Sequence, residues 1–65
     1  MRKYTIDMVI TEPHVTSYLT MAVGEDGCPW SYDLDKAREA LAYWREIQPL
    51  STYRLLVWDY TVLPD

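Results

Sequence analysis

The hydrophobic pattern has a helical period in one segment only, residues 33–48. At about 100° per residue, the apolar side chains of this segment gather in one arc and three acidic side chains lie opposite them. Asp33 is expected to cap the start of the helix, and Pro49 is expected to end it. The apolar positions are Leu34, Ala37, Ala40, Leu41, Trp44 and Ile47, and the acidic row is Asp35, Glu39 and Glu46.

The segments on either side of this helix have the pattern of β-strands. Residues 3–11 alternate between apolar and polar positions, and residues 16–23 predict a second strand after a loop of about five residues that contains Pro13. Residues 52–62 predict a third strand with two largely apolar faces, and residues 24–32 predict a loop. The inward positions are Tyr4, Ile6, Met8 and Ile10 in the first strand and Leu19, Met21 and Val23 in the second.

These elements predict one α+β domain over residues 1–65, with a three-stranded antiparallel sheet and one helix packed on one face, in the order β-β-α-β. We expect the strand order 2-1-3. The competing topology places the third strand parallel to the second through a right-handed crossover. The second sheet face is either an open interaction surface or is covered by the loop, with Trp30 or Tyr32 filling the gap. The candidates for this face are Val9, Tyr18, Leu56, Trp58 and Tyr60.

Composition narrows the classes of function. One cysteine, Cys28, allows no internal disulfide, and no apolar run reaches the roughly 20 residues that a membrane span needs. The first ten residues lack the pattern of a signal peptide. We expect a cytoplasmic protein, in the host cell if it is phage-encoded, with no membrane partner.

Motifs for catalysis and metal binding are missing from the sequence. One histidine and one cysteine give no metal-ligand spacing, and nothing predicts that Cys28 and His14 meet as a nucleophilic pair. The segment GEDG lacks the lysine and hydroxyl residue of a phosphate-binding loop. The sequence therefore predicts no enzyme and no cofactor.

The formal charge of −4 opposes direct nucleic-acid binding and favours a basic protein surface as partner. Asp35 and Glu39 are neighbours of like charge, which costs a few tenths of a kcal/mol of helix stability. The alternative is a solvated helix face whose charge only keeps the domain soluble. The candidate partner-binding residues are Glu25, Asp26, Asp33, Asp35, Glu39, Tyr43 and Glu46.

The whole-chain pattern and the acidic row resemble the small phage-encoded anti-CRISPR proteins that inhibit type I systems, some of which mimic DNA. The resemblance is to the general type of these proteins over the full chain, and it assigns no binding-site residues to this sequence. It implies a non-enzymatic inhibitor that occupies a Cas effector subunit, the one that recognises the PAM. We expect a monomer rather than a homodimer. The alternatives are a structural module that dimerises through the aromatic sheet face and a small nucleic-acid binder, which the charge disfavours.

Overall fold

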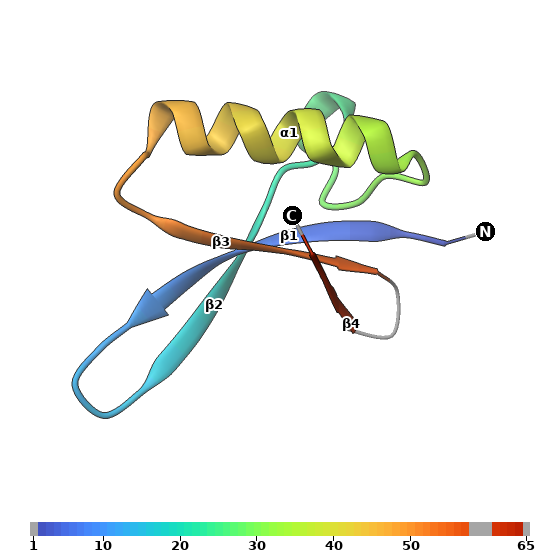
Figure 1. Cartoon of the computed structure of the whole chain (residues 1–65). Coiled ribbons are helices and arrows are strands. Elements are labelled where there is room, and N and C mark those ends of the chain that lie inside the picture. Colours follow the sequence, from blue (N-terminus) through green and yellow to red (C-terminus); the bar gives the residue numbers. More distant parts are fainter. Residues whose placement is uncertain (1, 58–60, 65) are drawn as a thin grey trace.

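The computed structural model describes residues 2–57 and 61–64, and it confirms the α+β class. Helix α1 lies across one face of a four-stranded antiparallel sheet whose strand order is β2-β1-β3-β4 (Figure 1). The expected neighbours of the first strand are therefore confirmed, and the expected number of three strands is wrong. The elements are β1 Tyr4–Thr11, β2 Thr16–Met21, the 3-10 helix η1 Glu25–Gly27, α1 Leu34–Ile47, β3 Thr52–Val57 and β4 Thr61–Leu63.

The predicted third strand covers residues 52–62, whereas the structure has two shorter strands, β3 and β4, in this part of the chain. β3 ends at Val57, which is paired with Tyr4 at the start of β1. A longer β3 would run past the end of its partner, and its backbone groups would lack ladder bonds. Instead β4 returns antiparallel along β3, with Val62 opposite Leu56. Trp58 and Tyr60, which were expected on this strand, lie outside the described residues.

The β1–β2 hairpin is tighter than expected. Glu12 N donates to Val15 O over 2.9 Å and Val15 N donates to Glu12 O over 3.3 Å, so the turn contains only Pro13 and His14. Pro13 fixes φ at about −65°, which suits the first central position of a type I or type II turn. This closure sets the register of the hairpin, in which Val9 lies opposite Tyr18.

The core forms between α1 and the sheet. Ile6, Leu55 and Ala37 have no exposed surface. The predicted cap is confirmed, because Asp33 Oδ1 accepts hydrogen bonds from Asp35 N at 2.9 Å and Lys36 N at 3.4 Å. The remaining core side chains are Met21, Val23, Leu41 and Tyr53.

Two positions expected in the core are exposed. Leu19 is 50% exposed and Ile47 is 48% exposed. The twisted hairpin diverges from the carboxyl end of α1 (Figure 1), so about half of each side chain stays uncovered. The predicted apolar stripe of the helix is therefore one turn too long.

The sequence left two alternatives for the second sheet face, open or covered, and part of this face is buried. Leu56 is 1% exposed. Arg54 donates from Nη2 to Asp7 Oδ2 over 2.9 Å, and its guanidinium lies 3.6 Å from the centre of the Tyr18 ring. The face thus carries an ion pair between strands, and among the described residues Tyr18 is the exposed aromatic side chain expected there. No helix in the described part of the chain is long and apolar enough to cross a membrane.

Candidate functional site

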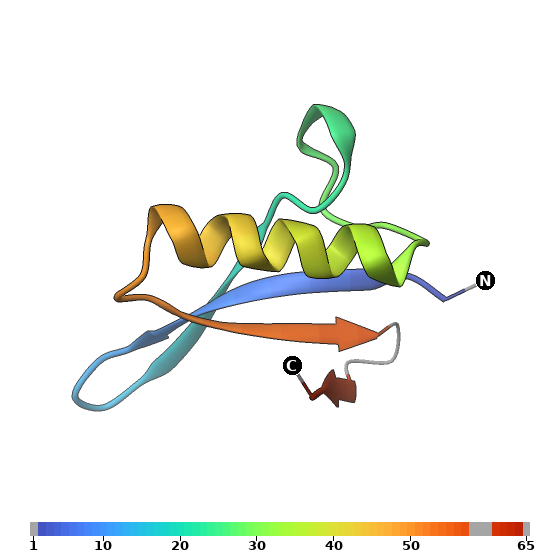
Figure 2. The same cartoon turned by 45° about the horizontal axis from the view of Figure 1, so that its top comes forward.

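The chain leaves the sheet between β2 and α1 and forms a projecting loop. Ser31 returns to the sheet edge, where it donates to Tyr4 O over 3.0 Å and accepts from Tyr4 N over 2.8 Å. Residues 22–30, called the 22–30 loop below, project past the helix (Figure 2). Cys28 O closes the loop by accepting from Val23 N at 2.8 Å and Gly24 N at 2.9 Å.

Two glycines permit this closure. A Cβ atom at position 24 would lie 3.0 Å from Trp30 O and 3.1 Å from the Cys28 Cβ, so Gly24 lets the two sides of the loop approach. Gly27 has φ +77°, the left-handed region that glycine adopts without strain. Asp26 precedes it with φ 59°, a conformation that aspartate tolerates better than most residues.

Side-chain contacts hold the loop beside the helix. Trp44 on α1 donates from Nε1 to Ala22 O over 2.8 Å. Asp33 N donates to Ser31 Oγ over 3.1 Å, which fixes the entry into the helix. Lys3 Nζ lies 4.6 Å from the centre of the Trp30 ring, a cation–π distance. The loop is therefore anchored at both ends and stacked on the amino-terminal segment.

Between this loop and α1 lies an open cavity of about 720 Å³, called the aromatic groove below. Tyr43 and Trp44 form part of the helix wall, with ring centres 5.4 Å apart and an edge-to-face angle of 73°. Trp30 and Tyr32 line it from the loop side and are 38% and 50% exposed. The other lining residues are Ala22, Val23, Gly24, Cys28, Ser31, Lys36, Glu39 and Ala40.

The acidic row of α1 meets this groove at Glu39. Asp35, Glu39 and Glu46 are all exposed, and Glu39 also lines the groove. None of the three makes an ion pair with another described residue. Tyr43, which forms part of the groove wall, is 57% exposed and lies one helical turn from Glu39.

The opposite flank of α1 is basic. A second cavity of about 390 Å³ lies there, lined by Arg38, Leu41, Ala42, Arg45 and Leu55. The charges on the helix are thus separated into a basic flank and an acidic row, with the aromatic groove on the far side of the row. A partner with exposed cations is attracted to the acidic side only.

The structure divides the predicted contact residues into groups. Glu39 and Tyr43 come together at the groove, and Asp35 and Glu46 continue the row. The Asp33 carboxylate caps the helix, so its oxygen is already engaged with backbone amides. Asp26 is exposed on η1, away from the helix row, and the Glu25 side chain lies outside the described residues.

The sequence did not identify the groove itself. Trp44 was assigned to the core face, and one of two alternatives placed Trp30 or Tyr32 over the opposite sheet face. They line the groove because Ser31 pairs with Tyr4 and directs the loop toward the helix. The available signal was the pair of aromatic residues that flank Ser31 directly before the helix cap.

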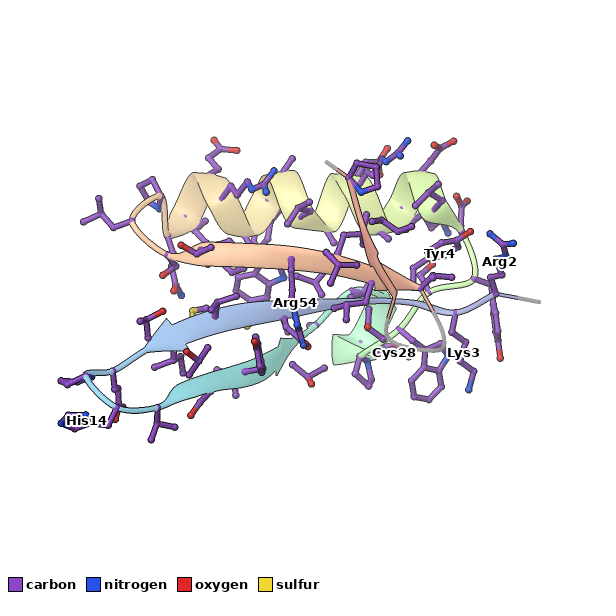
Figure 3. The ribbon with its side chains drawn as sticks, turned by 60° about the horizontal axis from the view of Figure 1, so that its bottom comes forward. Arg2, Lys3, Tyr4, His14, Cys28 and Arg54 are labelled. Atoms are coloured by element: carbon purple, nitrogen blue, oxygen red, sulfur yellow. The ribbon has the colours of Figure 1, made fainter. Side chains whose placement is uncertain are left out.

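Cys28 and His14 lie far apart (Figure 3), with His14 at the tip of the hairpin and Cys28 in the loop. They do not form a nucleophilic pair. Among the described residues, no group of three or more His, Cys, Asp and Glu side chains is placed to hold a metal ion.

Comparisons of the chain with protein-family models, with curated proteins and with solved structures give no match.

Proposed function

We propose that the protein is a non-enzymatic binding protein that attaches to a basic protein surface through the acidic row and the aromatic groove. The observation that supports this most directly is the position of Glu39, which belongs to both features and lies one helical turn from Tyr43 in the groove wall. An exposed acidic row alone fits a solvated helix face. A row of carboxylates beside exposed aromatic side chains offers the two groups that together bind a guanidinium.

The proposed contact is an arginine side chain of the partner. Its planar guanidinium stacks on an aromatic ring of the groove and donates hydrogen bonds to the Glu39 carboxylate. Asp35 and Glu46 attract further cations along the row, which spans about 16 Å at a rise of about 1.5 Å per residue. Lys36 also lines the groove and opposes a cation there, so Lys36→Ala should strengthen binding.

The biological role we propose is inhibition of a nucleic-acid-binding protein by occupation of its basic groove, as a phage or mobile-element product. Carboxylates and phosphates are both recognised by arginine, so a row of carboxylates competes for the same side chains. The candidate target is the PAM-recognising subunit of a type I CRISPR interference complex. Support for this target is the resemblance in size, charge and absence of catalytic motifs.

The test is a gel shift of PAM-bearing duplex DNA by a purified type I interference complex. The protein should prevent the shift, and Glu39→Lys should abolish this effect. Glu12→Lys, an equal change of charge at the exposed end of the hairpin, should leave it intact. A DNA shift that is unaffected by the protein would exclude this target. If Glu39→Lys and Glu12→Lys reduced the inhibition of DNA binding equally, the acidic row would be excluded as the contact.

A further inference from the structure

The outer edge of β2 is an unprotected strand edge. The hydrogen-bonded pairs of the hairpin alternate from Glu12 and Val15, so Ser17, Leu19 and Met21 direct their backbone groups toward β1. The N–H and C=O groups of Thr16, Tyr18 and Thr20 point away from the sheet. No described residue hydrogen-bonds these outward groups.

Proteins ordinarily protect such an edge with charged side chains, proline, bulges or a covering loop. β2 has the sequence TSYLTM, which contains no charge, no proline and no glycine, and its first five residues are exposed. The opposite edge strand, β4, is only three residues long, and Pro64 follows it. The two edges thus differ, and β2 alone offers a full strand for pairing.

We infer that β2 pairs with β2 of a second copy of this chain, antiparallel and centred on Tyr18. In this register Tyr18 lies opposite Tyr18 of the other copy, and Thr16 lies opposite Thr20 in both directions. Aromatic pairs and threonine pairs are among the cross-strand pairs that stabilise antiparallel sheets. The outward N–H and C=O groups of Thr16, Tyr18 and Thr20 in one copy then bond to the outward groups of the same residues in the other. A single two-fold rotation relates the two copies and satisfies all of these backbone groups.

The Tyr18 side chain is already ordered for this role. Its ring packs against the Arg54 guanidinium at 3.6 Å, and Asp7 holds Arg54 through Nε at 3.1 Å and Nη2 at 2.9 Å. A ring that is half exposed yet fixed loses little entropy when it meets a partner. The chain therefore presents an ordered aromatic side chain at the centre of its free edge.

The symmetry of this pairing has a consequence for the proposed binding surface. A two-fold axis that relates antiparallel neighbours in one sheet is perpendicular to that sheet. The two four-stranded sheets become one sheet, and both copies of α1 lie on the same face. Two aromatic grooves then face the same side, which raises the apparent affinity for a partner that has two basic sites.

The test is sedimentation equilibrium over micromolar to millimolar concentrations of the intact chain. We expect a species of twice the 7.7 kDa chain mass. We also expect the amides of Thr16, Tyr18 and Thr20 to exchange with deuterium more slowly as the concentration rises. A monomeric mass throughout, or exchange independent of concentration, would overturn the inference.

A pair of variants tests the register. Thr16→Lys/Thr20→Lys places a lysine opposite a lysine twice in each dimer and should raise the dissociation constant about tenfold. Thr16→Glu/Thr20→Lys places opposite charges there and should restore pairing. The first variant lowers the net negative charge of the chain by two units, and the second leaves it at −4. If overall charge repulsion decided the affinity, the first variant would therefore dimerise more tightly than the second, which is the opposite of our prediction. Equal dissociation constants for the two variants would contradict pairing centred on Tyr18. An extended peptide that pairs with β2 of a monomeric chain would also contradict it.

Discussion

The hydrogen bond between Trp44 and Ala22 links the projecting loop to the helix, and Trp44→Phe removes it. The donor is a half-buried indole N–H, and the distance to the carbonyl oxygen is 2.8 Å. A hydrogen bond of this kind contributes about 1 kcal/mol net, and a carbonyl left without a partner adds to the loss. We expect Trp44→Phe to lower the free energy of unfolding by about 1–2 kcal/mol.

This loss is large for so short a chain. At about 0.05–0.15 kcal/mol per residue, 65 residues give a total stability of roughly 3–10 kcal/mol. A change of 1–2 kcal/mol shifts the melting temperature of a domain this size by roughly 4–16 °C. Circular dichroism during heating measures this shift. Deuterium exchange at Val23 N and Gly24 N, which close the loop, reports whether the loop opens with it.

Trp30→Phe is the matched control. It makes the same substitution at an indole that has no hydrogen bond to a described residue, and a phenyl ring at this position can still contact Lys3. We expect its melting temperature to stay close to that of the unmodified chain. Equal melting temperatures for Trp44→Phe and Trp30→Phe would refute the assigned role of the Trp44 bond.

Three further substitutions test other parts of the fold. Asp33→Ala removes the acceptor at the start of α1 and should cost about 1 kcal/mol in urea unfolding, whereas Asp33→Ser keeps an acceptor and should cost less. Tyr53→Phe removes a buried hydroxyl that has no hydrogen-bond partner among the described residues, so it should raise the free energy of unfolding by about 1 kcal/mol; a loss would show that the hydroxyl is satisfied. Leu56→Ala should cost about 2–5 kcal/mol because Leu56 is 1% exposed, whereas Val62→Ala opposite it, at 53% exposed, should cost under about 0.5 kcal/mol; similar small losses would mean that this sheet face is open.

The sequence correctly predicted the elements that depend on residues close together in the chain. The helix and its cap follow from the spacing of apolar residues and from the short acceptor side chain of Asp33, which acts on amides two and three residues away. The place of β3 beside β1 was the preferred one of two topologies, and in both of them one helix covers the sheet. These features depend on neighbours in sequence or on a single packing requirement.

The features that the sequence missed depend on pairing between distant residues. β3 ends where Val57 reaches the start of β1, and no pattern within residues 52–62 marks that point. Leu19 is exposed because the twisted hairpin diverges from the carboxyl end of the helix, and Leu56 is buried although it lies on the sheet face away from the helix. The acidic row was readable from helical spacing, whereas the groove beside it requires the pairing of Ser31 with Tyr4.

The most direct test of the proposed function is a nuclear magnetic resonance titration of the isotope-labelled protein with a short arginine peptide and with the same peptide carrying citrulline. Citrulline keeps the shape of arginine and lacks its charge. We predict that the arginine peptide shifts the signals of Glu39, Tyr43 and the Trp30 indole, that these shifts weaken with salt, and that citrulline leaves them unchanged. Equal shifts with both peptides, or shifts confined to other parts of the chain, would contradict the proposed binding site.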